Sequence, residues 1–133
     1  MADQLQICIV EDSPPIRRLM EVLLTKAGFA VVSFERVDEA IRWLQEHRPL
    51  AVLCDLILPD GNGIDVLRAV RAQPGGEQIP VVAVTGLAQE KDQEYYLHHG
   101  FDAYLIKPLS TVTFAAQVRE ILERKEALPP TGS

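Results

Sequence analysis

Asp55 is the residue in this sequence best placed to carry out chemistry. It follows an uninterrupted apolar run at 50–54 and comes shortly before the turn residues at 60–63. An apolar run of this length predicts a strand buried on both faces. Asp55 would then emerge at the carboxyl end of that strand, where open α/β sheets place their ligands. We predict that Asp55 is a nucleophile that accepts a phosphoryl group, because carboxylates can form acyl phosphates.

Two further carboxylates, Glu11 and Asp12, follow the first apolar run of the chain at 5–10. Carboxylates gathered near Asp55 repel one another, so a metal ion, a shared proton or a basic side chain must compensate. A set of oxygen ligands without paired His or Cys favours a hard divalent cation such as Mg²⁺. We expect Asp12 and Asp55 to bind Mg²⁺ directly, and Glu11 to act in the outer sphere or through water. The backbone carbonyl of Ile57 is a further expected ligand.

Thr85 and Lys107 also end apolar runs. If these runs are strands of one parallel sheet, both side chains project at the end of the sheet that carries Asp55. A hydroxyl and an ammonium there can bind the oxygens of a phosphoryl group, and the ammonium offsets charge during transfer. Thr85 and Lys107 are therefore predicted to complete the catalytic set around Asp55, with Thr85 moving toward the new oxygens after transfer.

The elements that position these residues alternate regularly along the chain. Apolar runs predict five strands, at 5–10, 29–34, 50–54, 79–84 and 103–106. Five helices are predicted: one capped by Ser13 and stopped by Gly28, one capped by Asp38 and ending by Arg48, and others at about 64–73, at 89–99 and from Ser110 or Thr111 onward. Such alternation calls for a parallel sheet covered by helices on both faces.

The predicted fold class is therefore α/β, a flavodoxin-like (βα)5 doubly wound parallel sheet with strand order 2-1-3-4-5. In that order the first and third strands are neighbours, so Glu11, Asp12 and Asp55 meet in one cleft. The domain is expected to span residues 1–126. Residues 127–133 are expected to be a flexible tail or linker stub, because 128–133 shows no helical or strand pattern.

Composition argues against several other classes of protein. The chain has 133 residues, 47% of them hydrophobic and 24% charged, and a net charge of -6. These values fit one globular domain and argue against a nucleic-acid surface. Its apolar runs are shorter than the ~20 residues of a membrane span, and its first residues lack the pattern of a signal peptide. A cytoplasmic location is expected, with Cys8 and Cys54 as free, buried thiols.

Taken together and in order, these residues resemble the receiver domain of two-component response regulators, a family of small phosphoaccepting switches. The resemblance covers about residues 5–125 and rests on Glu11-Asp12, Asp55 with 56–59 after it, Gly63, Thr85, Tyr104 and Lys107-Pro108. Glu11 stands where many members have aspartate. The resemblance implies that Asp55 receives phosphate from a histidine kinase or a histidine phosphotransfer protein, with Mg²⁺. It also contributes to the strand order given above.

The resemblance further implies that Thr85 and Tyr104 form a switch pair. When Thr85 moves to the phosphoryl group, the Tyr104 ring turns inward and alters the face made by the fourth helix, the fifth strand and the last helix. That face is the expected contact surface for a downstream effector protein or domain, and for a homodimer. The chain is thus expected to be a switch with at most self-catalysed phosphorylation and dephosphorylation, rather than an enzyme. A strand tyrosine that only fills the core is the competing interpretation of Tyr104.

Two bulky apolar residues, Ile57 and Leu87, lie two positions after Asp55 and Thr85. We predict that they hinder the attack of water and slow the loss of phosphate. An aspartyl-phosphate phosphatase, one alternative function, needs a second acid where Ile57 stands. The other alternative, a pseudo-receiver that acts only as an interaction module, is disfavoured by the intact set of residues around Asp55.

Overall fold

The apolar runs form a five-stranded parallel sheet in the computed structural model, which describes residues 6–127. Its strands, in spatial order, are β2 (Ala30–Phe34), β1 (Gln6–Val10), β3 (Ala51–Cys54), β6 (Val81–Thr85) and β7 (Ala103–Ile106). Because β6 and β7 are the fourth and fifth strands of this sheet along the chain, the predicted order 2-1-3-4-5 is confirmed. A separate antiparallel pair, β4 (Ile57–Leu58) and β5 (Gly61–Asn62), follows β3 and was not predicted.

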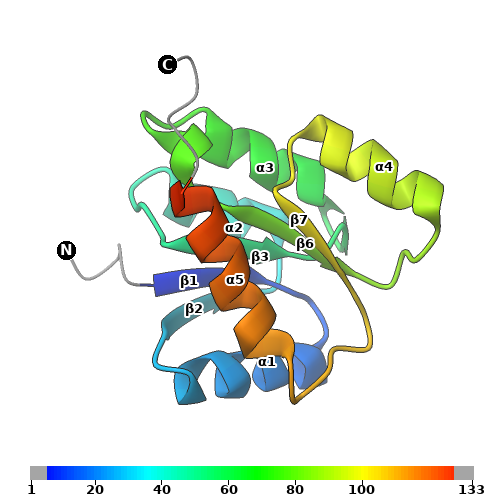
Figure 1. Cartoon of the computed structure of the whole chain (residues 1–133). Helices are drawn as coiled ribbons and strands as arrows, with labels where there is room; N and C mark the ends of the chain where they lie inside the picture. Colours follow the sequence, from blue (N-terminus) through cyan, green and yellow to red (C-terminus); the bar gives the residue numbers. More distant parts are fainter. Residues whose placement is uncertain (1–5, 128–133) are drawn as a thin grey trace.

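Helices cover both faces of the sheet (Figure 1). One face carries α1 (Pro14–Lys26) and α5 (Phe114–Ala127), and the other carries α2 (Val37–Leu44), α3 (Gly63–Arg71) and α4 (Glu90–His99), with a short 3-10 helix, η2 (Gly76–Gln78), after α3. The two faces follow from the two-residue period of a strand. In β1, Ile7 and Ile9 pack toward α1 and α5, whereas Cys8 and Val10 pack toward the other three helices. None of the helices within 6–127 has the length and apolar character needed to span a membrane.

The start of α2 differs from the prediction because a distant side chain caps it. Asp38 is the N-cap predicted from the sequence, and this is wrong: the helix begins at Val37, with Arg36 in the N-cap position. The Asp60 carboxylate, from the turn between β4 and β5, accepts hydrogen bonds from the amides of Val37 (2.7 Å) and Asp38 (3.0 Å). A carboxylate contributed from outside the segment thus satisfies the free amides of the first turn.

The starts of α1 and α5 also differ in detail from the prediction. Ser13 occupies the N-cap position of α1, as expected, but its side chain makes no capping hydrogen bond. Helix α5 begins at Phe114, later than predicted, and Ser110 Oγ accepts hydrogen bonds from two amides of the turn at 111–113. At its other end α5 reaches Ala127, one residue past the predicted domain boundary. The rest of the predicted tail lies outside the described residues.

Loss of the Asp60 cap is expected to lower stability in a pH-dependent way. Desolvation acts to raise the pKa of Asp60, but the amides of Asp38 and Val37 and the Arg36 guanidinium together bring it below the ordinary 3.8. A depressed carboxylate pKa stabilises the fold above the unfolded pKa, and this contribution is lost as the pH falls through the folded pKa. In urea unfolding, Asp60→Ala should be less stable than the wild type at neutral pH, and the difference should shrink below about pH 4. The control Glu46→Gln, at an exposed acid, should have the stability of the wild type at each pH. A stability difference between Asp60→Ala and the wild type that does not change with pH would contradict the prediction.

A charged network joins several elements at the amino ends of β6 and β7. Asp102 accepts hydrogen bonds from the Val81 amide (2.8 Å) and from Arg71 (2.9 Å), and it pairs with Lys125 (2.8 Å). Arg71 also donates to three backbone carbonyls nearby. We call this set the Asp102 network; it cross-links α3, β6 and α5 at the end of the sheet opposite to Asp55.

Candidate functional site

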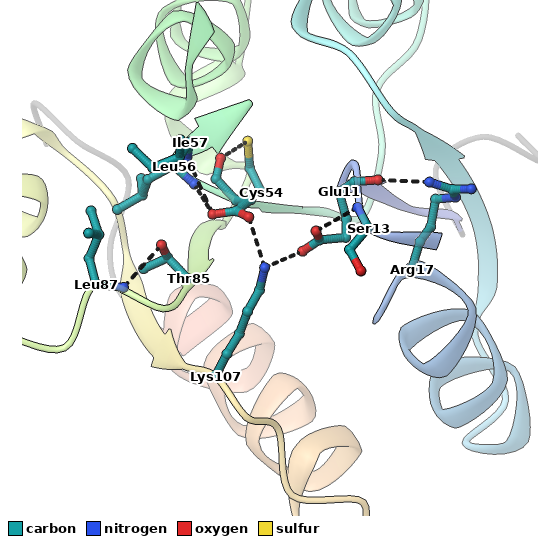
Figure 2. A network of polar contacts seen from close by, with 10 residues as sticks. Glu11, Ser13, Arg17, Cys54, Leu56, Ile57, Thr85, Leu87 and Lys107 are labelled. Carbon is teal, nitrogen blue, oxygen red and sulfur yellow. Dashed lines mark hydrogen bonds and ion pairs between the residues drawn. The ribbon is translucent and has the colours of Figure 1, made fainter. Parts of the chain in front are cut away.

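Asp55 lies directly after β3, at the carboxyl end of the sheet, as predicted. Every residue of β3 is buried, and pairing with β1 continues one step further because the Asp55 amide donates to the Val10 carbonyl (2.9 Å). The Asp55 side chain is only 10% exposed. Its Oδ1 accepts hydrogen bonds from the amides of Leu56 (2.7 Å) and Ile57 (3.3 Å) (Figure 2). The loop after the strand thus fixes the orientation of the carboxylate.

Gly63 allows this loop to stay close to Asp55. Its amide donates to the Leu56 carbonyl (2.9 Å). A Cβ atom at position 63 would lie 2.8 Å from the Asp55 carbonyl oxygen and 3.1 Å from a methyl group of Leu56. Only glycine permits such an approach without displacing the backbone. The glycine identified in the sequence is therefore a steric requirement of the loop that orients Asp55.

Glu11, Asp12 and Asp55 come together as predicted, each offering a carboxylate oxygen within 4.8 Å of the others. Glu11 is 1% exposed and its Oε2 accepts a hydrogen bond from the Ser13 amide (3.1 Å), whereas Asp12 is exposed. Burial raises the pKa of Glu11, although Lys107 and the Ser13 amide act to lower it. Three carboxylates that offer only oxygen donors have the chemistry that suits a hard divalent cation. The residues present therefore fit the predicted Mg²⁺ site.

Lys107 supplies positive charge to this cluster. Its Nζ lies 2.7 Å from Glu11 Oε1 and 2.8 Å from Asp55 Oδ2 (Figure 2). The contact with Asp55 is a hydrogen bond, whereas the contact with Glu11 is an ion pair outside hydrogen-bond geometry. Burial acts to lower the pKa of Lys107, but the contacts with Asp55 and Glu11 outweigh it and raise the pKa, so the side chain stays charged. The ion pair between Lys107 and Glu11 was not predicted, because the strand order does not determine which of several nearby carboxylates a long side chain contacts.

Thr85 and Tyr104, the predicted switch pair, are connected through the backbone of Leu87. Thr85 ends β6 and is 1% exposed, and its Oγ1 accepts a hydrogen bond from the Leu87 amide (3.4 Å). Tyr104, in β7, donates its hydroxyl to the Leu87 carbonyl (2.6 Å) and also packs against the core. Burial, followed by the negative charge of Asp92, raises the pKa of Tyr104, so its hydroxyl remains a donor. The bridging role of Leu87 was missed, and its only signal in the sequence is its place two residues after Thr85.

Ile57 lies in a short hairpin rather than in an irregular loop. It pairs with Asn62 of β5, and the residue is 58% exposed. The β4–β5 hairpin was missed because its two loop residues, Pro59 and Asp60, are not the Asn-Gly or Asp-Gly pair typical of hairpin loops. Its two-residue strands are also too short to show a period. The ligand role of the Ile57 carbonyl stays a prediction.

Cys8 and Cys54 are free thiols buried in β1 and β3, as predicted. Burial raises the pKa of both thiols, and Cys54 Sγ donates to the Asp55 carbonyl (3.0 Å). Buried thiols with raised pKa values are poor nucleophiles and poor metal ligands. Both cysteines therefore serve as packing residues.

Known proteins with similar sequences include response regulators. Residues 7–119 match the response regulator receiver domain. The chain is 34% identical over 119 residues to the phosphate regulon transcriptional regulatory protein PhoB of Escherichia coli (strain K12), an alignment that covers 90% of this chain and 52% of PhoB. The chain thus spans about half the length of such curated relatives. An uncharacterised 14.6 kDa protein of Leptolyngbya boryana is 31% identical over 127 residues, which cover 96% of this chain and 95% of that protein.

A solved structure shares both the fold and the sequence pattern. The receiver domain of the sensor histidine kinase PA1611 from Pseudomonas aeruginosa PAO1 superposes with a TM-score of 0.77 at 32% identity, covering 90% of this chain and 95% of that chain. That structure has a magnesium ion coordinated in its active site cleft. Sequence and fold therefore agree: the chain belongs to the response regulator receiver domain family of two-component phosphorelay systems.

Proposed function

We propose that Asp55 is the phosphoacceptor of this receiver domain. The observation that carries the proposal is a buried carboxylate that accepts bonds from two backbone amides and from Lys107, beside Glu11 and Asp12. In the reaction, an Asp55 oxygen bonds to the phosphorus atom of a phosphohistidine while the phosphorus–nitrogen bond breaks, and the nitrogen keeps the electron pair. Lys107 offsets the negative charge that develops between Asp55 and the incoming oxygens.

The proposed cofactor is Mg²⁺, with Asp12 and Asp55 as direct ligands. Support comes from the oxygen-only donor set and from the magnesium ion in the cleft of the PA1611 receiver domain. Glu11 is occupied by its ion pair with Lys107, which agrees with a place in the outer sphere, and the Ile57 carbonyl completes the proposed set. When bound, the ion would neutralise charge on the phosphoryl oxygens.

Thr85 and Tyr104 are the proposed switch. A phosphoryl group brings about -1.5 to -2 charges to Asp55 and offers strong acceptors to the Thr85 hydroxyl. We infer that Thr85 moves away from the Leu87 amide to reach these acceptors, and Leu87 is also the residue whose carbonyl binds the Tyr104 hydroxyl. The same movement therefore releases Tyr104 and changes the face formed by α4, β7 and α5.

Receiver domains interact with histidine kinases and with effector domains, and we propose both kinds of partner here. The phosphodonor is a histidine kinase or a histidine phosphotransfer protein, and the α4–β7–α5 face contacts a downstream effector or a second copy of the chain. The proposed location is the cytoplasm, and the proposed domain limits are 1–126, close to the end of α5 at Ala127, with a tail after the helix. Ile57, an exposed apolar side chain where a phosphatase needs an acid, supports a switch with at most self-catalysed turnover.

Incubation with acetyl phosphate and Mg²⁺ tests the proposal. The intact mass should increase by one phosphoryl group, and chelation of the metal should prevent the increase. Hydroxylamine should remove the label, since it cleaves acyl phosphates, and peptide mapping should assign the label to Asp55. Histidine is the other residue type expected to accept a phosphoryl group, and the chain has three, His47, His98 and His99. A label that resists hydroxylamine, or one that maps to any of these histidines, would overturn the proposal.

Polar substitution of Ile57 is expected to accelerate the loss of phosphate. The amide of this exposed isoleucine contacts Asp55, the proposed carrier of the acyl phosphate. A polar side chain at this position can orient a water molecule for attack, whereas the apolar side chain cannot. Ile57→Gln should raise the hydrolysis rate on the order of tenfold, a small share of what a positioned acid–base group provides. Ile57→Val is the control and should keep the slow rate. Equal hydrolysis rates for the Gln and Val variants, measured by decay of the labelled mass, would refute the idea.

A further inference from the structure

Asn62 lies between the loop that orients Asp55 and helix α4. Its side-chain Oδ1 accepts a hydrogen bond from the Ile64 amide (2.8 Å) and caps α3, while its Nδ2 donates to the hydroxyl of Tyr96 in α4 (3.2 Å). Its backbone amide donates to Asp65 (3.1 Å), which completes a capping box. One end of the Asn62 amide group is thus engaged with α3 and the other with α4.

The backbone of Asn62 is connected to Asp55. Asn62 pairs with Ile57 in the β4–β5 hairpin, and the Ile57 amide donates to Asp55 Oδ1 (3.3 Å). The path from Tyr96 to the Asp55 carboxylate therefore consists of one side-chain hydrogen bond, one residue pair of the hairpin and one amide. It does not include the switch pair.

Tyr96 has a physical reason to keep this contact. The residue is 8% exposed and belongs to the core between α4 and the sheet. Its ring meets Tyr95 (5.1 Å) and Phe101 (6.0 Å) edge to face, which fixes the position of the hydroxyl. A buried tyrosine hydroxyl needs a hydrogen-bond partner, and within residues 6–127 that partner is Asn62.

We propose that Tyr96 is a positioning residue for Asp55 and that it acts through Asn62. This inference rests on the proposed function, in which Asp55 accepts a phosphoryl group. The bond between Tyr96 and Asn62 fixes the hairpin and so keeps the Ile57 amide on the carboxylate. Because such coupling is reciprocal, a phosphoryl group that displaces the Ile57 amide also disturbs the bond to α4. The chain then has a second route from Asp55 to α4, parallel to the switch pair.

Amide hydrogen exchange without any phosphodonor is the first test. Tyr96→Phe removes only the hydroxyl, and Tyr95→Phe, at the neighbouring tyrosine that is 54% exposed, is its matched control. The Ile57 amide should exchange about three- to tenfold faster in Tyr96→Phe, the range for loss of one hydrogen bond, and at the wild-type rate in Tyr95→Phe. Asn62→Ser keeps a capping oxygen but is too short to reach Tyr96, so it should cause a similar increase. The Tyr96→Phe/Asn62→Ser double variant should exceed neither single variant, because both lose the same bond.

The rate of Asp55 labelling by acetyl phosphate is the second test. It should fall about three- to tenfold in Tyr96→Phe at saturating Mg²⁺, because a looser hairpin positions the carboxylate less well, and stay unchanged in Tyr95→Phe. Exchange at Ile57 that is unaffected by Tyr96→Phe would overturn the inference, even if the variant melts at a lower temperature. If wild-type protein takes up no label, the proposed function fails, and the Ile57 exchange rate alone then decides whether Tyr96 positions the loop.

Discussion

Asp55→Asn is expected to abolish phosphorylation by acetyl phosphate. A carboxamide oxygen is a far weaker nucleophile toward phosphorus than a carboxylate, and the substitution also removes an anionic ligand from the proposed metal site. Asparagine keeps an acceptor oxygen for the amides of Leu56 and Ile57, so the loop is expected to retain its shape. In the intact-mass assay, wild-type protein should gain one phosphoryl group, whereas the variant should show no mass increase.

The matched control for this result is Asp38→Asn, at an exposed carboxylate in the first turn of α2. It should be labelled at the wild-type rate. Circular dichroism should show the same helical content for both variants, which separates loss of chemistry from loss of fold. Labelling of Asp55→Asn at the wild-type rate would show that another residue is the phosphoacceptor.

Lys107→Met is expected to impair both phosphorylation and folding. The substitution keeps an apolar stem but removes the cation that bridges Glu11, which is 1% exposed, and Asp55, which is 10% exposed. Removing one partner of a buried ion pair leaves uncompensated charge and costs about 3 kcal/mol, toward the lower end of the usual range because Lys107 is itself 15% exposed. The labelling rate should fall about 10²- to 10³-fold, as when one preorganised group is lost from a site of developing charge.

Mg²⁺ distinguishes the two effects of Lys107→Met. A divalent cation among Glu11, Asp12 and Asp55 would supply positive charge, so it should restore part of the stability of the variant, whereas the labelling rate should stay low even at saturating Mg²⁺. Urea unfolding with and without Mg²⁺ measures the first quantity, and the mass assay measures the second. Lys91→Met, at an exposed lysine of α4, should match the wild type in both. A wild-type labelling rate for Lys107→Met at saturating Mg²⁺ would show that Lys107 acts only in folding.

Features that depend on apolar runs of sequence, and on the residues that follow each strand, were predictable from the sequence. The apolar residues of β1 and β3 specify buried strands, and a parallel sheet brings the residues that follow its strands to one end. For this reason Asp12, Asp55 and Lys107 were correctly expected to converge. The polar sequence of α4 alone defines the end of that helix poorly. Gly100, which adopts a left-handed conformation (φ 119°) directly after α4, marks the end instead, as predicted.

Features that depend on single contacts between distant segments were not predictable. The Asp60 carboxylate caps α2 from another loop, so the local sequence of α2 carries no sign of it. Leu87 joins Thr85 and Tyr104 through its backbone amide and carbonyl, which every residue type except proline has. The contact of Asn62 with Tyr96 requires the packing of α4 against the β4–β5 hairpin. Residue types and spacing indicate which groups reach one end of the sheet, whereas pairwise contacts follow from tertiary packing.

The Asp102 network stabilises the end of the sheet that lies opposite to the acidic cluster of Glu11, Asp12 and Asp55. Its cross-links among α3, β6 and α5 lie at the amino ends of the strands and share no residue with the acidic cluster at the carboxyl ends. An exposed residue at the rim of the acidic cluster, such as Ile57, is therefore under little demand from folding. Substitutions of Ile57 are expected to change the proposed rate of phosphate loss without disturbing the Asp102 network, so this separation gives protein engineers a position at which to adjust signalling kinetics without redesigning the core.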